Sequence, residues 1–199
     1  MGLFGWLKGK TDGGNGNAGA WREAWTRAVA SLDEGALASL EADLKRTPPF
    51  ADDVEIEEEM LDALRHLLEL ERALAAARLP VVATSHRVVG ADACHFSAPV
   101  SMPDDPAQPT GRLLLTSSRA VFAGGARTPA LPWHATREVI QSGRDLLFVY
   151  RRAQDDAGHR FRCNSFTDAL CGAAIARHLM RSGQSAGRER RRDGGGGRL

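Results

Sequence analysis

Residues 111–122, with the sequence GRLLLTSSRAVF, set the architecture of this chain. Two short apolar runs flank the polar corner TSSR, a pattern that predicts a β-hairpin with a three- or four-residue connection. Further short alternating runs follow, and then one amphipathic segment from about Phe166 to Met180 has helical spacing. Antiparallel strands closed by one C-terminal helix predict a small sandwich or a partly open barrel.

Pro80 marks the point where the periodicity changes from helical to alternating. We expect strands after it at residues 81–89, 94–100, 112–116, 120–123, 130–134, 137–141, 146–151 and 160–164. Asn164 or Ser165 should cap the last helix, because both side chains can accept a hydrogen bond from a helix amide.

Three helices are expected before Pro80. The first starts near Ala20 and carries Trp21 and Trp25 on one face. The second follows a capping box formed by Ser31 and Glu34 and ends near residue 46. The third covers residues 54–78, with Asp52 and Asp53 as its caps. An intramolecular hairpin or three-helix unit is the preferred interpretation, and dimerisation through residues 54–78 is the alternative.

The fold class is therefore α+β, in four segments. Residues 1–19 are expected to be a disordered N-terminal segment and linker, 20–79 an acidic helical unit, 80–182 the sheet domain and 183–199 a disordered basic tail. The helical unit has 7 basic and 14 acidic residues and the sheet domain 12 and 8, so the +1 net charge of the chain conceals units of −7 and +4. Opposite charges favour docking between the units or two different partners.

The composition narrows the class of protein. Hydrophobic residues make up 43% of the chain, enough for a packed core, and three cysteines at scattered spacing argue against a disulfide framework. No apolar run approaches the roughly 20 residues of a membrane span, and the N-terminus does not follow a signal-peptide pattern. We therefore expect a cytoplasmic protein.

The hairpin resembles that of bacterial PH-like and GRAM-like domains. Members commonly show the pattern G-x-L-x-L-T-x-x-R-x-x-F, which is matched here by Gly111, Leu113, Leu115, Thr116, Arg119 and Phe122. The strand LPWH at residues 131–134, a later hairpin near residues 155–158 and the closing helix extend the resemblance over about residues 81–180. Thr116 can hydrogen-bond the turn, and Arg119 can cover apolar surface with its stem.

This resemblance implies a seven-stranded sandwich with one end closed by the helix, used to bind lipids, peptides or proteins. Some relatives bind phosphoinositides through clustered Lys and Arg in the loop between the first two strands. The corresponding region here, HRVVGADACH at residues 86–95, has Arg87 alone and an acidic Asp92. No lipid-binding residue is therefore carried over from the family.

A metal-dependent or hydrolytic site near His86 and His95 is a rival hypothesis, with Cys94 as a further ligand. Neither Cys-x-x-Cys nor His-x-x-x-His spacing occurs, and neighbours on a regular strand face opposite sides. Ser117, Ser118, His134 and Asp145 form only a scatter, without a nucleophile elbow, P-loop or dinucleotide fingerprint. We expect no enzyme activity, no cofactor and cysteines that serve as small core residues.

The N-terminus offers a candidate membrane contact. Its residues are Leu3, Phe4, Trp6, Leu7, Lys8 and Lys10. One short segment gives marginal attachment, so the arginines at 188 and 190–192 would have to act with it on an anionic surface. The expected function is protein interaction or peripheral association with the inner face of a membrane, without specific nucleic-acid binding, by a monomer or a helix-mediated dimer.

Overall fold

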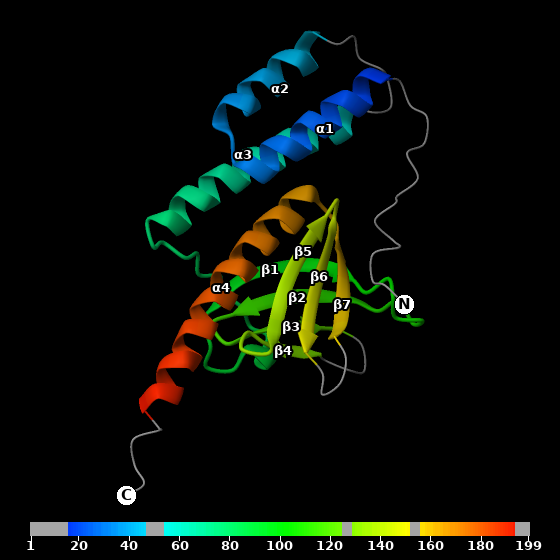
Figure 1. Cartoon of the computed structure of the whole chain (residues 1–199). Helices are drawn as coiled ribbons and strands as arrows, with labels where there is room; N and C mark the ends of the chain where they lie inside the picture. Colours follow the sequence, from blue (N-terminus) through cyan, green and yellow to red (C-terminus); the bar gives the residue numbers. More distant parts are fainter. Residues whose placement is uncertain (1–15, 47–53, 125–128, 152–155, 194–199) are drawn as a thin grey trace, which may run out of the picture. The chain divides into compact units, whose positions relative to one another are not determined.

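The structure of the chain is a computed structural model that describes residues 16–46, 54–124, 129–151 and 156–193 (Figure 1). Its residues group into two compact units, Met1–Leu61 and Asp62–Leu199, so the division falls inside the long helix α3. This boundary differs from the expected one at Pro80, because the second half of α3 belongs with the sheet: Leu70 packs against the sheet core.

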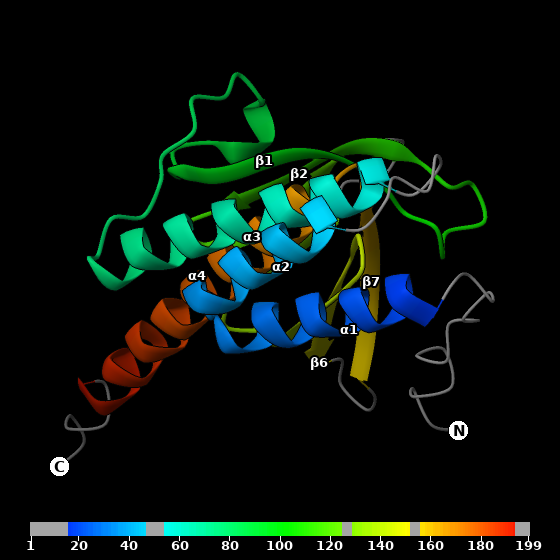
Figure 2. The same cartoon turned by 90° about the horizontal axis from the view of Figure 1, so that it is seen from above.

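The first unit contains α1 (Gly16–Ser31), α2 (Glu34–Arg46) and the start of α3 (Val54–Ala75). Figure 2 shows α1 and α2 as separate helices joined by a short turn. The indole of Trp21 donates to the Leu40 carbonyl at 3.1 Å, and that of Trp25 donates to the Met60 carbonyl at 2.7 Å. Both tryptophans are buried, so two indoles from one helix join it to both of the others.

The turn between α1 and α2 corrects the expected capping box. Asp33 is the cap: its Oδ1 accepts from the amides of Gly35 at 2.8 Å and Ala36 at 3.2 Å. Ser31 belongs to α1 and donates to the Arg27 carbonyl. Leu32 between them has a φ of 54°, and this left-handed residue ends α1 one position before the next cap. Asp52 and Asp53 lie outside the described residues.

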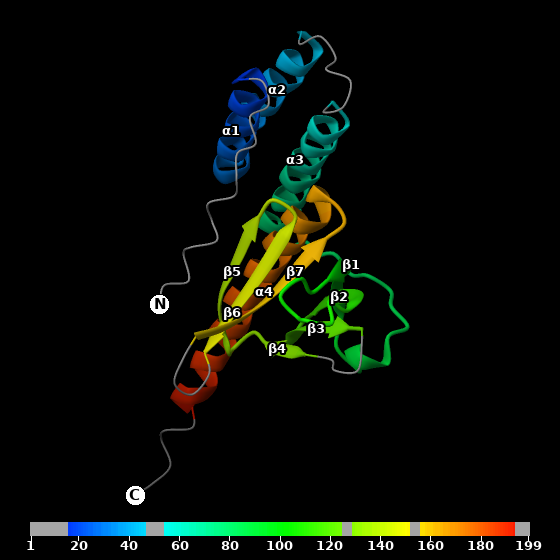
Figure 3. The same ribbon diagram turned by 90° about the vertical axis from the view of Figure 1, so that its right-hand side faces the viewer.

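The second unit is built on a seven-stranded antiparallel sheet in the order β4-β3-β2-β1-β7-β6-β5. The strands are β1 (Cys94–Ser101), β2 (Thr110–Thr116), β3 (Arg119–Ala123), β4 (Ala130–Pro132), β5 (Thr136–Ser142), β6 (Asp145–Arg151) and β7 (Asp156–Cys163). Strands β1 and β7 pair only through Val100 with Cys163 and Ser101 with Arg162. Figure 3 shows the two halves of the sheet, β1–β4 and β5–β7, on either side of this corner.

The predicted hairpin is confirmed as β2–β3, but its connection is two residues, Ser117 and Ser118, and not the expected three or four. The Thr116 hydroxyl fixes the turn: it accepts from the Arg119 amide at 3.2 Å and lies 2.9 Å from the Arg119 carbonyl oxygen. Arg119 spans the turn and donates to the Val88 carbonyl. The turn residues of the sequence pattern therefore serve folding.

Helix α4 (Phe166–Asp193) closes the sheet, and the Ser165 hydroxyl caps it by accepting from the Asp168 amide at 3.0 Å. Its apolar face enters the core shared with both halves of the sheet. The fully buried large side chains of this core include Leu113, Leu115, Phe122, Trp133, Leu146, Phe148 and Phe161. The α+β class, with helices before a seven-stranded antiparallel sheet and one closing helix, is confirmed.

Three expected segments need correction. Residues 16–19 were expected in the disordered N-terminal segment, but they form the first turn of α1. Residues 81–89 are not a strand: they end in a short 3-10 helix (Arg87–Val89). They cover the face of β1–β3 that lies away from the main core, where Val82, Val88 and Val89 pack with Leu114 and Val121. Their alternating apolar residues therefore mark a cover over the sheet. The segment after residue 182 is not wholly irregular, because α4 continues to Asp193. In the described part of the chain, no helix is long and apolar enough to cross a bilayer.

Replacing Leu170 with Asp tests the packing of α4. Leu170 is 3% exposed, so Leu170→Asp places a carboxylate among apolar atoms and should lower the free energy of unfolding by about 3–5 kcal/mol. Chemical denaturation followed by circular dichroism measures the effect. The control is Ser182→Asp, at an exposed position of the same helix, which should change stability by less than about 1 kcal/mol. Equal stability of the two variants would contradict the packing.

Gly183 provides a second test, because α4 passes very close to Trp133 there. A Cβ at Gly183 would lie 2.9 Å from the Cβ of Trp133, whose own side chain is 1% exposed. Gly183→Ala should therefore destabilise the protein by about 1–2 kcal/mol although alanine favours helix. Gly19→Ala, in α1 with nothing within 4 Å of the added Cβ, is the matched control and should be neutral or stabilising. A Gly183→Ala variant with a higher melting temperature would refute the close contact.

Candidate binding surface

The three strands β5, β6 and β7 have one face in the core and one face away from it. Val139 of β5, Phe148 of β6 and Phe161 of β7 are 3%, 0% and 1% exposed and belong to the core. Because successive side chains of a strand alternate, their neighbours Ile140 and Leu147 lie on the opposite face, which we call the outer face.

An aliphatic strip of Ile140, Leu147 and Val149 occupies the centre of the outer face. Ile140 pairs with Leu147 across β5 and β6, and all three side chains are half-buried. On β7, Gly158 lies opposite Val149, and a Cβ there would come within 2.9 Å of the Leu147 Cδ1. The Leu147 side chain therefore extends toward the glycine, which leaves space for it. Polar residues are the usual choice for a solvated sheet face, so these aliphatic side chains point to an interaction surface.

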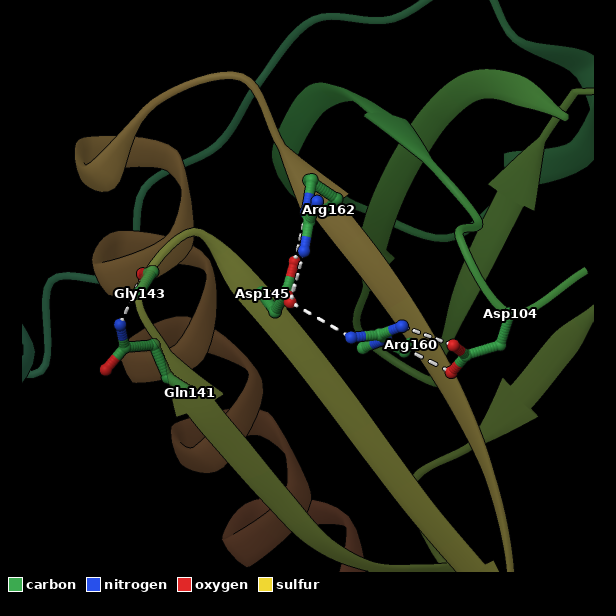
Figure 4. Close-up of polar contacts among 6 residues, drawn as sticks. All are labelled: Asp104, Gln141, Gly143, Asp145, Arg160 and Arg162. Atoms are coloured by element: carbon green, nitrogen blue, oxygen red, sulfur yellow. Dashed lines mark hydrogen bonds and ion pairs between the residues drawn. The ribbon is translucent and has the colours of Figure 1, made fainter. Parts of the chain in front are cut away.

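Charged side chains border this strip in an alternating network (Figure 4). Arg162 binds Asp145 through two contacts, Nε to Oδ1 at 2.8 Å and Nη2 to Oδ2 at 3.0 Å. Arg160 contacts Asp145 Oδ2 at 3.4 Å and also binds Asp104 through two nitrogens, one of them Nε at 3.1 Å. Gln141 donates to the Gly143 carbonyl at 2.7 Å in the neighbouring β5–β6 turn.

The network fixes the edge of the outer face. Asp145 is only 9% exposed and needs its two arginine partners, because an unpaired buried carboxylate is costly. Asp104 lies in the loop between β1 and β2, so Arg160 holds that loop against β7. The Arg162 side chain remains 56% exposed, and Asp145 raises its pKa through a hydrogen bond. A guanidinium has five donors, so Arg162 can also receive a carboxylate from a partner.

The loop between β1 and β2 also changes the comparison with phosphoinositide-binding relatives. Because residues 81–89 are not a strand, the first loop of the sheet is 102–109, MPDDPAQP, which contains two aspartates and no Lys or Arg. This loop lacks the basic cluster.

Two of the three proposed metal candidates, His95 and Cys94, are engaged in side-chain hydrogen bonds. A register shift between Cys94 and Phe96 places His95 in a bulge. The His95 Nδ1 is 2.7 Å from the Pro80 carbonyl oxygen, and its Nε2 is 2.9 Å from the Ser117 hydroxyl. The Cys94 thiol donates to the Phe96 carbonyl. Among the described residues, no group of three or more His, Cys, Asp or Glu side chains could hold a metal ion.

The other candidate residues are dispersed. Ser117 contacts His95 and Ser118 contacts Asp92, whereas Asp145 lies in the arginine network. The six N-terminal membrane candidates lie outside the described residues. The arginines at 188 and 190–192 fall within α4, whose backbone is helical there. The outer face is not recognisable in the sequence, because β6 reads LLFVY and a continuous apolar run does not show which residues face the core.

Comparisons with known proteins find similarity to solved structures at low sequence identity. No family model matches the chain, and no curated protein matches it significantly. The PDZ-RhoGEF DH/PH domains in complex with GTP-gamma-S activated RhoA share 11% identity and a TM-score of 0.38, covering 83% of this chain and 54% of that one. The DH/PH domains of p115-RhoGEF share 12% identity and a TM-score of 0.37, covering 79% and 53%. The chain thus spans about half the length of these structures, and such distant likenesses assign it no function.

The cysteines should be chemically inert in the folded protein. Burial raises the pKa of Cys163 and Cys171 to about 12 each, with Asp168 adding to both shifts, and burial also raises the pKa of Cys94. The thiolate is the reactive form, so at pH 8 all three thiols should react much more slowly with a disulfide reagent such as DTNB than in the unfolded chain. Titration with and without guanidinium measures this. Rapid modification of a native thiol would contradict it.

Proposed function

We propose that this chain is a non-enzymatic binding protein whose sheet domain docks a protein partner on the outer face of β5–β7. The observation that carries the proposal is the half-buried aliphatic strip of Ile140, Leu147 and Val149 on a face away from the core, bordered by the exposed Arg162. The fitting partner presents aliphatic side chains to the strip and a carboxylate to Arg162. Apolar area supplies affinity in such a contact, and the charged pair supplies orientation.

The two halves of the sheet differ in what packs on the face away from the core, and this difference supports a protein partner for β5–β7. Over β1–β3, the protein's own segment supplies Val82, Val88 and Val89 as a cover. The strip on β5–β7 belongs neither to the main core nor to the cluster under this cover. A protein segment that brings similar aliphatic side chains would complete this half in the same way.

The charge of the outer face favours a protein over a membrane surface. Arg160 and Arg162 are paired with Asp104 and Asp145, so the network carries no net charge. An anionic bilayer attracts surfaces with surplus cations, and this described network supplies none. The alternative is peripheral membrane attachment through Leu3, Phe4, Trp6 and Leu7, which would use a different part of the chain. A cytoplasmic location is proposed in both cases.

A photo-crosslinking amino acid at position 147 tests the proposal in the full chain. p-Benzoylphenylalanine replaces Leu147, and after irradiation of expressing cells the adduct is sized and identified by mass spectrometry. The expected result is a discrete protein adduct. The control carries p-benzoylphenylalanine in place of Arg112, which is exposed on the other half of the sheet, and it should give no such adduct. A lipid adduct alone, or the same protein captured from both positions, would overturn the assignment.

A further inference from the structure

We infer that the partner of the outer face is a second copy of this chain, joined to the first about a two-fold axis that passes beside Leu147. The inference rests on the proposed docking face and names its occupant. Its basis is a charge pattern that makes the face complementary to itself.

The strand register places Glu138, Leu147 and Arg162 on one diagonal of the outer face. Glu138 pairs with Val149, Leu147 pairs with Ile140 and Arg160, and Arg162 pairs with Asp145. Each end of the diagonal is therefore one strand and two residues away from Leu147. With strands about 4.8 Å apart and a rise of about 3.4 Å per residue, each end lies about 8 Å from Leu147 in opposite directions.

Opposite charges at equal distances from a centre satisfy the rule for an isologous contact. A two-fold axis that lies between two stacked sheets, perpendicular to this diagonal, brings Glu138 of one copy over Arg162 of the other, and the reverse. The same operation places the two Leu147 side chains together at the axis. The strands of the two copies then cross steeply, close to the orthogonal class of sheet packing.

The side chains involved are available for this contact. Glu138 is exposed and has Arg177 of α4 as a charged neighbour, the Arg162 side chain is 56% exposed, and the aliphatic strip between them is half-buried. Asp145 occupies only the Nε and Nη2 of Arg162 in the described contacts, which leaves the far edge of the guanidinium for a second carboxylate. A second copy thus supplies both requirements of the partner, aliphatic side chains and a carboxylate. A contact three strands wide is small, so the dimer should be reversible.

The test uses charge pairs at the axis, where the two copies contribute the same residue. Leu147→Glu should oppose two glutamates and Leu147→Arg two arginines, so each variant alone should dimerise at least roughly tenfold more weakly than the unmodified protein. A one-to-one mixture should restore association as a heterodimer, because glutamate then meets arginine. Sedimentation velocity of the full chain over a concentration series, with one variant carrying a fluorescent label, measures both effects.

Two controls separate this interface from others. Arg112→Glu changes charge on the other half of the sheet and should leave the dimer unchanged, and circular dichroism confirms that each variant is folded. Glu138→Arg, which does not touch the buried Asp145, should weaken the dimer independently.

Three results would overturn the inference: an unmodified protein that is monomeric throughout the series, Leu147 variants that associate as strongly as the unmodified protein, or a mixture that stays dissociated. If a different protein is crosslinked from position 147 while the chain is monomeric, the two-fold contact fails and the docking face stands.

Discussion

The buried indole of Trp133 is the contact on which the sheet domain depends. Its Nε1 donates to the Thr116 carbonyl at 2.8 Å, its ring lies 6.4 Å from that of Phe148, and its Cβ faces Gly183 of α4. One side chain thus joins the β2–β3 hairpin, strand β6 and the closing helix. Burial of an indole removes about 200 Å² from water, which favours folding by about 5 kcal/mol. The glycine at 183 is required because the helix approaches so closely.

The second constraint is the corner where the two halves of the sheet meet. Strands β1 and β7 share only two residue pairs there, too few to define the angle between the halves. The network from Asp104 through Arg160 and Asp145 to Arg162 lies beside this corner and joins the β1–β2 loop to β7 and β6. These partly buried ion pairs contribute little net free energy of folding, and their main effect is to position the loop and the strands. This arrangement holds the edge of the outer face in place, so a docking partner meets a defined surface.

The outer face departs from the ordinary pattern of a solvated sheet. The protein covers the aliphatic residues of β1–β3 with its own segment, whereas Ile140, Leu147 and Val149 on β5–β7 are only half-buried. The exposed Glu138 and Arg162 lie on opposite sides of these residues. Apolar centre and charged ends together describe a surface suited to binding one protein partner in one orientation.

Local patterns were sufficient for much of the fold. The TSSR corner, the Ser165 cap and the apolar runs of β1 to β7 act over a few residues, so the sequence predicted the hairpin, the closing helix and the α+β class. Non-local contacts settled the rest. The sequence of residues 81–89 predicted a strand, but Val82, Val88 and Val89 find buried partners above β1–β3 and form a cover. The ring nitrogens of His95 are occupied by Pro80 and Ser117, 15 and 22 positions away. The outer face depends on the strand register. Only the pairing of β6 with β5 and β7 decides which residues of the run LLFVY face the core and which lie on the opposite face.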